Sequence, residues 1–245
     1  VSGAEIMSDY PSPPEEVIEG IIGVGEKMML AGASKAGKTF CLLNLASAVS
    51  TGGKWLGHQC VKGEVLFLNF EVSGKRMAER LRDLNGAGVD LSTVDFRNLR
   101  GRRLEWQSLQ QELQEFANRK KYKLFILDPI YKLLGETSEN DNSEVGAMLH
   151  EVEKIAEASG AAIAFAHHFS KGSKGDVSVQ DRASGAGVFA RDPDAILTLT
   201  DHKDGEGLLV VEGNLRNYAA PAPVTIQYDY PVFLERDIPA EVRGR

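Results

Sequence analysis

The clearest chemical signal in the sequence is a glycine-rich stretch, GASKAGKT, at positions 32–39. It fits the pattern G-x-x-x-x-G-K-[ST], in which the glycines let the backbone curl so that its N–H groups face a phosphate. Lys38 would reach the β- and γ-phosphates of a nucleoside triphosphate such as ATP, and the hydroxyl of Thr39 can ligate Mg²⁺. A simple glycine-rich turn between a strand and a helix is the alternative interpretation. The residues expected to line the phosphates are Gly32, Ala33, Ser34, Lys35, Ala36, Gly37, Lys38, Thr39 and Phe40.

Two carboxylates stand at the ends of apolar runs. Asp128 ends KLFILD, and an acid at the tip of a buried strand is what the metal of a P-loop enzyme needs, held through water. Glu71 ends EVLFLNFE, where a carboxylate could orient the attacking water or take its proton. The alternatives are a strand-ending turn at Asp128 and a surface acid at Glu71.

Two adjacent histidines, His167 and His168, end a further apolar run. Neighbouring side chains on a strand point to opposite faces, and no cysteine or further histidine stands at metal spacing, so zinc is disfavoured. A buried structural imidazole remains one interpretation. In the other, His167 reaches the carboxyl edge of the sheet beside Asp128 and hydrogen-bonds the γ-phosphate. His168 is then either a second contact or a packing residue.

Short apolar runs alternate with helical patterns, which indicates an α/β fold with a mostly parallel sheet covered on both faces and ending in an antiparallel hairpin. Ligands of such sheets bind outside the carboxyl ends of the strands, where the candidate residues fall. Asp141 is the expected N-cap of the last helix, and Gly160 follows its end. Strands are expected at 27–31, 64–70, 123–128 and 161–167, helices at 39–50, 74–84, 104–120 and about 145–156, the hairpin at 194–200 and 208–213, and a last edge strand at 224–228.

The totals are those of an ordinary globular chain. Its 245 residues suit one large domain, taken as 26–245 with an irregular, partly docked arm at 1–25. No apolar run is long enough to span a membrane, the start does not look like a secretion signal, and two cysteines cannot form a disulfide framework, so the cytoplasm is expected. The net charge of −7 disfavours a wholly basic nucleic-acid coat and confines any such binding to local, salt-sensitive loops.

The order of features along the chain resembles that of RecA-like ATPases. These features are a P-loop, a strand ending in Glu, an apolar run ending in Asp and a strand ending in His. The closer resemblance is to RepA-type plasmid replicative helicases and covers about residues 15–235. It implies a RecA-like core, ATP and Mg²⁺ as cofactors, and homohexameric rings with ATP held between subunits. The stretches that carry it are GEVLFLNFEVSGKRMAERL, the segment from FILDP to FAHHFSKG, and DRASGAGVFARDPDAILTL.

The resemblance also implies roles for individual residues. Glu71 takes the position of the catalytic base and Asp128 that of the Walker B residue, while Lys38 and Thr39 bind phosphate and Mg²⁺. His167 falls at the γ-phosphate sensor position. Arg80, nine residues after Glu71, is a nucleotide contact.

In the same family a K-x-R stretch supplies an arginine finger to the neighbouring subunit. Arg216 matches this arginine, but Asn214 replaces the lysine, which could weaken subunit-coupled hydrolysis. A surface arginine on a hairpin is the alternative, and Arg182 is a weaker second candidate.

Two loops, 135–143 and 170–180, correspond to those that grip single-stranded DNA in RecA-like helicases. Lys171 and Lys174 supply charge in the second loop, but neither loop has an aromatic residue for base stacking, and the first is acidic. Flexible solvated loops are the alternative.

Two functions from different classes follow. The first is a ring-forming, DNA-stimulated ATPase or helicase that replicates a plasmid, phage or mobile element. The second is a regulatory ATPase that uses ATP to switch protein assembly without unwinding DNA, which the acidic surface favours. A small-molecule kinase is disfavoured because the sequence has no basic lid with clustered arginines.

Overall fold

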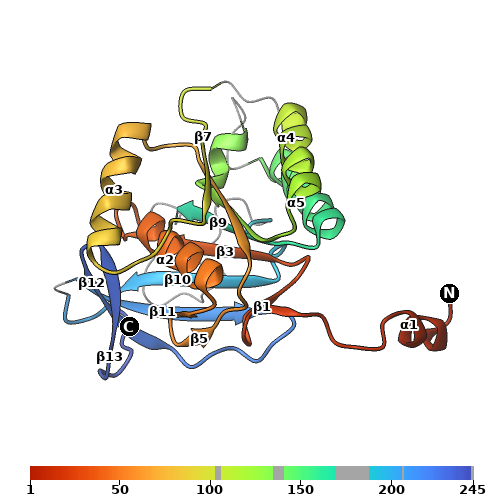
Figure 1. Cartoon of the computed structure of the whole chain (residues 1–245). Coiled ribbons are helices and arrows are strands. Elements are labelled where there is room, and N and C mark those ends of the chain that lie inside the picture. The colour runs from red at the N-terminus through yellow and green to blue at the C-terminus, as the bar shows by residue number, and fades with distance from the viewer. Residues whose placement is uncertain (103–105, 135–140, 169–187, 206, 244–245) are drawn as a thin grey trace.

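A nine-stranded sheet forms the centre of the molecule, with strand order β13-β12-β11-β10-β3-β9-β8-β6-β7. The computed structural model describes the whole chain except residues 103–105, 135–140, 169–187, 206 and 244–245. The strands from β10 to β7 are parallel, and the remaining three continue the sheet as antiparallel neighbours (Figure 1). The expected fold class, α/β with a mostly parallel sheet and a terminal hairpin, is therefore confirmed.

The elements follow the expected order along the chain. In the parallel part they are β3 (Lys27–Gly32), α2 (Lys38–Thr51), β6 (Glu64–Asn69), α3 (Gly74–Gly86), β7 (Asp95–Asn98), α4 (Trp106–Arg119), β8 (Tyr122–Asp128), the 3-10 helix η1 (Ile130–Leu134), α5 (Asn142–Ser159), β9 (Ala162–His168) and β10 (Ala195–Asp201). The antiparallel part is β11 (Leu208–Leu215), β12 (Val224–Asp229) and β13 (Val232–Arg236). The short elements are α1 (Gly3–Asp9), β1 (Glu16–Ile18), β2 (Ile22–Gly23), β4 (Lys54–Trp55) and β5 (His58–Gln59).

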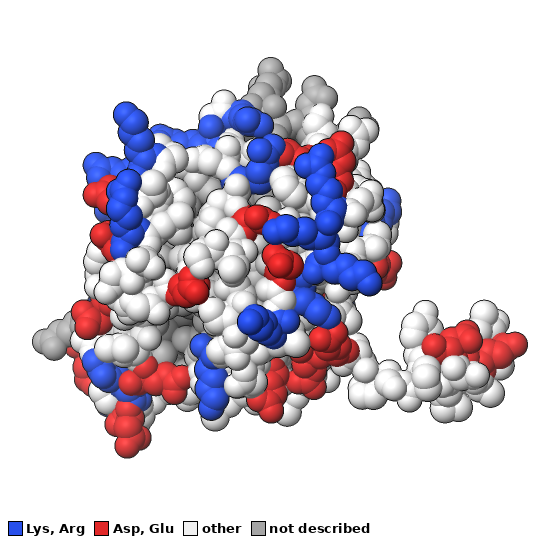
Figure 2. All heavy atoms as spheres, in the orientation of Figure 1, with Lys and Arg blue, Asp and Glu red and all other residues white. Residues whose placement is uncertain are grey.

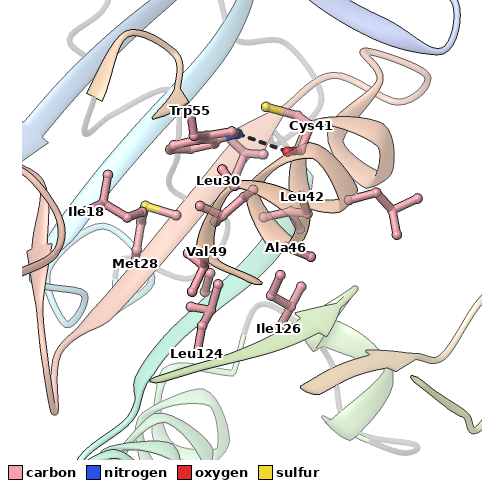
Figure 3. Close-up of a cluster of buried hydrophobic side chains, with 14 of the residues drawn as sticks. Ile18, Met28, Leu30, Cys41, Leu42, Ala46, Val49, Trp55, Leu124 and Ile126 are labelled. Carbon is pink, nitrogen blue, oxygen red and sulfur yellow. Dashed lines mark hydrogen bonds between the residues drawn. The ribbon is translucent and has the colours of Figure 1, made fainter. Parts of the chain in front are cut away.

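The central strands of the sheet are buried on both faces, so they read as continuous apolar runs. Neighbouring residues of one strand enter different cores: Met28 lies in the core beneath α2 and α3, and Met29 in the core beneath α4 and α5. α2 is buried almost all round, and Figure 3 shows Leu42, Ala46 and Val49 of this helix among strand side chains. The indole of Trp55 fixes the helix further by donating a hydrogen bond to the carbonyl of Cys41 (3.0 Å; Figure 3).

The predicted end signals of α5 are confirmed. The carboxylate of Asp141 accepts hydrogen bonds from the backbone N–H groups of Ser143 and Glu144, and Gly160 ends the helix with a φ of 65°. Because both ends are fixed, α5 leads directly into β9, the strand that carries the two histidines.

Two strands at the margins differ from the expectation, and the arm is partly docked. The run 224–228 is not the last strand, because β13 pairs outside β12. β7 was not expected at all, since its half-exposed residues DFRN show no apolar pattern. The expected arm of 1–25 is divided: residues 1–16 are exposed and α1 projects from the body (Figure 1), whereas Val17 and Ile22 are buried in the core. No helix in the described part of the chain is long and apolar enough to cross a membrane.

Candidate nucleotide-binding site

A cavity of about 440 Å³ opens at the carboxyl edge of the parallel strands. It lies where the loop after β3, the turn after β6 and the end of β8 meet, the place at which parallel sheets bind ligands. Its lining residues are Ser34, Lys35, Gly37, Lys38, Thr39, Phe40, Glu71, Val72, Arg80, Asp128, Pro129, His168 and Tyr228.

The glycine-rich loop curls as its sequence predicts. Gly37 has a φ of +80° and Lys35 one of +68°, the left-handed region that a tight anion-binding loop requires. Lys38 is 6% exposed, and its ammonium group donates hydrogen bonds to the carbonyls of Gly32 (2.8 Å) and Ala33 (2.7 Å). Burial lowers the pKa of Lys38 to about 8, against the opposing pull of the Asp128 and Glu71 carboxylates. A phosphate would supply the compensating negative charge directly.

Asp128 and Thr39 lie together at the floor of the cavity. Asp128 is 4% exposed, and its carboxylate accepts a hydrogen bond from the Thr39 hydroxyl. Burial raises the pKa of Asp128 to about 6, which the hydrogen bond from Thr39 opposes and the charge of Glu71 reinforces. A carboxylate and a hydroxyl fit Mg²⁺, which takes few protein oxygens and completes its shell with phosphate and water. No group of three or more histidine, cysteine or acidic side chains at metal distance occurs among the described residues, so a protein-caged metal is not indicated there.

The sequence had suggested that Glu71 ends a strand. In the structure it lies in a turn beyond the end of β6. The buried side chain of Asn69 holds this turn, because its Oδ1 accepts from the N–H groups of Glu71 (3.3 Å) and Val72 (2.9 Å). Its Nδ2 donates to the carbonyl of Val72 (2.5 Å). The turn keeps Glu71 exposed at the cavity wall, where a carboxylate can reach water.

His168, and not the expected His167, lines the cavity. Nδ1 of His168 lies 3.1 Å from Nζ of Lys38. His167 is 1% exposed on the opposite face of the sheet, where its ring stacks on Phe189 with centroids 4.1 Å apart. Neither ring nitrogen of His167 has a hydrogen-bond partner among the described residues, and burial lowers its pKa to about 4, so it is neutral.

The cause is the alternation along β9. Phe165 and Ile163 share the face of His167 and belong to the core beneath α5, while Ala164 and Ala166 share the face of His168 and belong to the core beneath α2. The two alanines are the sequence signal that could have assigned the faces, since small residues fit under the helix that follows the glycine-rich loop.

Arg80 lines the same cavity together with Phe40 and Tyr228, and the sequence had not marked Tyr228 as a site residue. Its guanidinium carbon is 5.0 Å from the ring centroid of Phe40, and that ring packs against Tyr228 (5.8 Å). Tyr228 also stacks on Phe233 of β13, whose ring covers Gly37 so closely that a Cβ there would lie 2.8 Å from it. The run YDYPVF at 228–233 was the available signal for this hairpin.

Arg216 is not near the cavity of its own subunit. It follows β11 at the amino edge of the sheet, across the ~20 Å length of the six-residue strand β3 from the glycine-rich loop. Nη1 contacts Oδ1 of Asp194 (3.0 Å), and Nη2 donates to the carbonyls of Arg191 (2.8 Å) and Asp192 (3.1 Å). Any contact between Arg216 and a nucleotide therefore requires a second subunit.

Most residues of the two predicted DNA loops lie outside the described part of the chain. Residues 135–140 and the whole of 170–180, with Lys171 and Lys174, lie outside the described residues, as does Arg182. Asp141 is the N-cap of α5, and the two residues after it form the first turn of that helix.

A family model described as an AAA domain matches residues 3–174, a range that contains the glycine-rich loop, Glu71, Asp128 and His168. The chain belongs to the AAA domain family. No curated protein was found to match the sequence. This AAA domain is a P-loop ATPase, and its cavity brings together the side chains of Lys38, Thr39, Asp128 and Glu71.

Proposed function

We propose that this AAA domain is the motor of a RepA-type, ring-forming DNA helicase or DNA-dependent ATPase that replicates a plasmid, phage or mobile element. The observation that carries the proposal is the separation of two candidate catalytic groups. Glu71 lines the cavity at the carboxyl edge, whereas Arg216 lies at the opposite edge of the same sheet. A ring in which one subunit's amino edge faces the next subunit's cavity would bring the two together.

Hydrolysis within one subunit follows from the cavity. Lys38 and the N–H groups of the loop hold the β- and γ-phosphates, and Glu71 orients the attacking water and accepts its proton. Mg²⁺ held near Thr39 and Asp128 would neutralise charge on the phosphates. The neutral imidazole of His168, next to Lys38, can hydrogen-bond the γ-phosphate. We transfer to His168 the sensor role that the resemblance gave to His167.

The aromatic mouth of the cavity is suited to the nucleotide base. Tyr228 offers a ring face and Arg80 a planar guanidinium, both of which stack on flat π systems. Because Tyr228 comes from the C-terminal hairpin, base binding would also fix that hairpin against the glycine-rich loop.

The trans contribution rests on Arg216 exchanging its partners. In one subunit its charge is neutralised by Asp194, an acid with a side chain that is 16% exposed. At a subunit interface the guanidinium would leave this carboxylate for the γ-phosphate of the neighbour, a change that couples assembly to hydrolysis.

Separation of a forked DNA duplex tests the helicase. We expect strand displacement with Mg²⁺ and ATP, none with a non-hydrolysable analogue, and none for Glu71→Gln, which should still bind ATP. Loss of a general base typically lowers the rate about 10²–10⁴-fold. ATP hydrolysis without separation of the DNA strands and without any response to DNA would instead favour the regulatory ATPase.

A further inference from the structure

A second cavity, of about 490 Å³, lies beside the nucleotide cavity and shares Glu71 with it. Its other lining residues are Phe70, Leu99, Arg100, Gly101, Arg102 and Lys132. They come from the turn after β7 and from η1 after β8, so this cavity also opens at the carboxyl edge. We propose that it binds the phosphodiester backbone of single-stranded nucleic acid, an inference that rests on the proposed DNA-dependent function.

The net charge of this cavity is opposite in sign to the net charge of the chain. Arg100, Arg102 and Lys132 are exposed and form no ion pair with any residue that the structure describes, whereas Arg97 and Lys120, from the same part of the fold, both do. With Glu71 the cavity carries a net charge of about +2 in a chain of net charge −7. Figure 2 shows Lys and Arg side chains gathered over the half of this face where Figure 1 places α3, β7 and α4.

The turn that presents the two arginines is fixed. The N–H of Arg102 donates to the carbonyl of Leu99 (3.1 Å), and Gly101 between the arginines has a φ of +76°. A β-turn of this kind needs glycine at that position, because a residue with a Cβ would be strained. The turn thus places Arg100 and Arg102 on either side of Gly101, where both side chains can contact phosphate.

The lining favours backbone contact over base recognition. Phe70 and Leu99 are 4% and 2% exposed, so no aromatic face among the described lining residues is open for stacking. Cations without stacking partners contact phosphates independently of sequence, as a motor that moves along a strand requires.

Hydrogen bonds to the backbone and side chain of Asn69 link this cavity to the turn that carries Glu71. The N–H of Leu99 donates to the backbone carbonyl of Asn69 (2.8 Å), and the side chain of Asn69 holds the turn of Glu71. A nucleic-acid phosphate that pulls on the arginine turn therefore acts on the residue that positions Glu71, which gives nucleic acid a route to hydrolysis.

The test is fluorescence anisotropy of labelled oligo(dT) over a salt series, with Mg²⁺ and a non-hydrolysable ATP analogue. For the double variant Arg100→Ala/Arg102→Ala we expect at least ~10-fold weaker binding at low salt. The slope of log affinity against log salt should become shallower by about 1.4, or about 0.7 per lost phosphate contact.

Two control variants accompany it. Arg100→Lys/Arg102→Lys keeps both charges and should retain the wild-type salt slope, because phosphate contact needs charge more than shape. Lys62→Ala/Lys121→Ala removes the same charge from exposed residues just before β6 and β8, at the amino edge, and should bind like the wild type. Melting temperatures of all variants show that each is folded.

The outcomes separate this inference from the proposed function. If the wild type binds DNA and the arginine variant binds with the same affinity and slope, the cavity assignment is overturned and the helicase proposal stands. If DNA binding is unchanged but inhibition of hydrolysis by inorganic phosphate is lost, the cavity serves free phosphate and the nucleic-acid assignment is wrong. If the wild type binds no DNA at any salt concentration, both the cavity assignment and the helicase proposal are wrong.

Discussion

Nδ1 of His168 lies 3.1 Å from Nζ of Lys38, at the point where a γ-phosphate would be held. Burial, with a further contribution from the charge of Lys38, lowers the pKa of His168, so the ring is neutral near pH 7. A neutral imidazole beside the phosphate-binding ammonium can donate a hydrogen bond without adding charge. This pair distinguishes the two histidines, which the sequence places next to each other.

Replacement of His168 should impair hydrolysis more than binding. We expect His168→Ala to lower kcat for ATP about 10–100-fold with a smaller change in KM, because a contact to the γ-phosphate strengthens in the transition state. His168→Gln, which keeps a donor, should retain more of the activity. Wild-type kcat in His168→Ala would contradict the placement.

Replacement of His167 should instead change the stability of the chain. His167→Phe removes two buried nitrogens that have no partner in the part of the chain that the structure describes, and it keeps a ring of similar size against Phe189. The free energy of unfolding should rise by about 1–2 kcal/mol, since an unsatisfied buried polar group carries a desolvation cost. Denaturant melts measure this, and a variant less stable than the wild type would show that His167 has a partner after all.

Nucleotide binding should take up protons at mildly alkaline pH. With a pKa of about 8, Lys38 is half neutral at pH 8, and a bound phosphate favours its charged form. Binding at pH 8 should therefore take up ~0.5 proton, less toward pH 7, where Lys38 is already charged. Calorimetry with a non-hydrolysable analogue, in buffers of different ionisation enthalpy, measures the uptake; heats independent of buffer at pH 8 would contradict it.

Arg216 should act in trans. Arg216→Ala should retain ATP binding but lose about 10³-fold in hydrolysis, the low end of the range for arginine fingers. Lys38→Ala should be inactive for lack of bound ATP. Mixing the two variants should restore hydrolysis, because a Lys38→Ala subunit still supplies Arg216 to its neighbour's ATP.

This mixing experiment also addresses the local role of Arg216. Loss of its bonds to Asp194 and two carbonyls could lower activity by destabilising the chain, but such a loss is not repaired by a second variant. Absence of any recovery in the mixture, with both variants folded, would reject the trans assignment.

Much of this site could be predicted because its signals are local. The spacing of glycines and Lys38 defines the loop, and the doubly covered strands β6, β8 and β9 read as continuous apolar runs. The same double burial hid the orientation of the histidines: when both faces of a strand are apolar, periodicity cannot assign a residue to one of them.

The other features that the sequence did not predict have different physical causes. β7 and β13 lie at the two edges of the sheet, where strands are half exposed and carry charged residues, so no apolar run longer than three residues marks them. Glu71 leaves its strand because the side chain of Asn69 closes a turn, a bond that depends on local geometry and not on hydrophobic pattern. Tyr228 is distant in sequence from every other residue that lines the cavity, so only the fold brings it to the site.

The measurement that tests the central claim most directly is the rate of ATP hydrolysis with and without single-stranded DNA, with Lys38→Ala as the background. The account predicts Lys38-dependent hydrolysis that DNA stimulates several-fold at low salt, with the stimulation declining as salt rises. Hydrolysis that depends on Lys38 but is unchanged by DNA at both low and moderate salt would contradict a DNA motor and leave an ATPase of another kind.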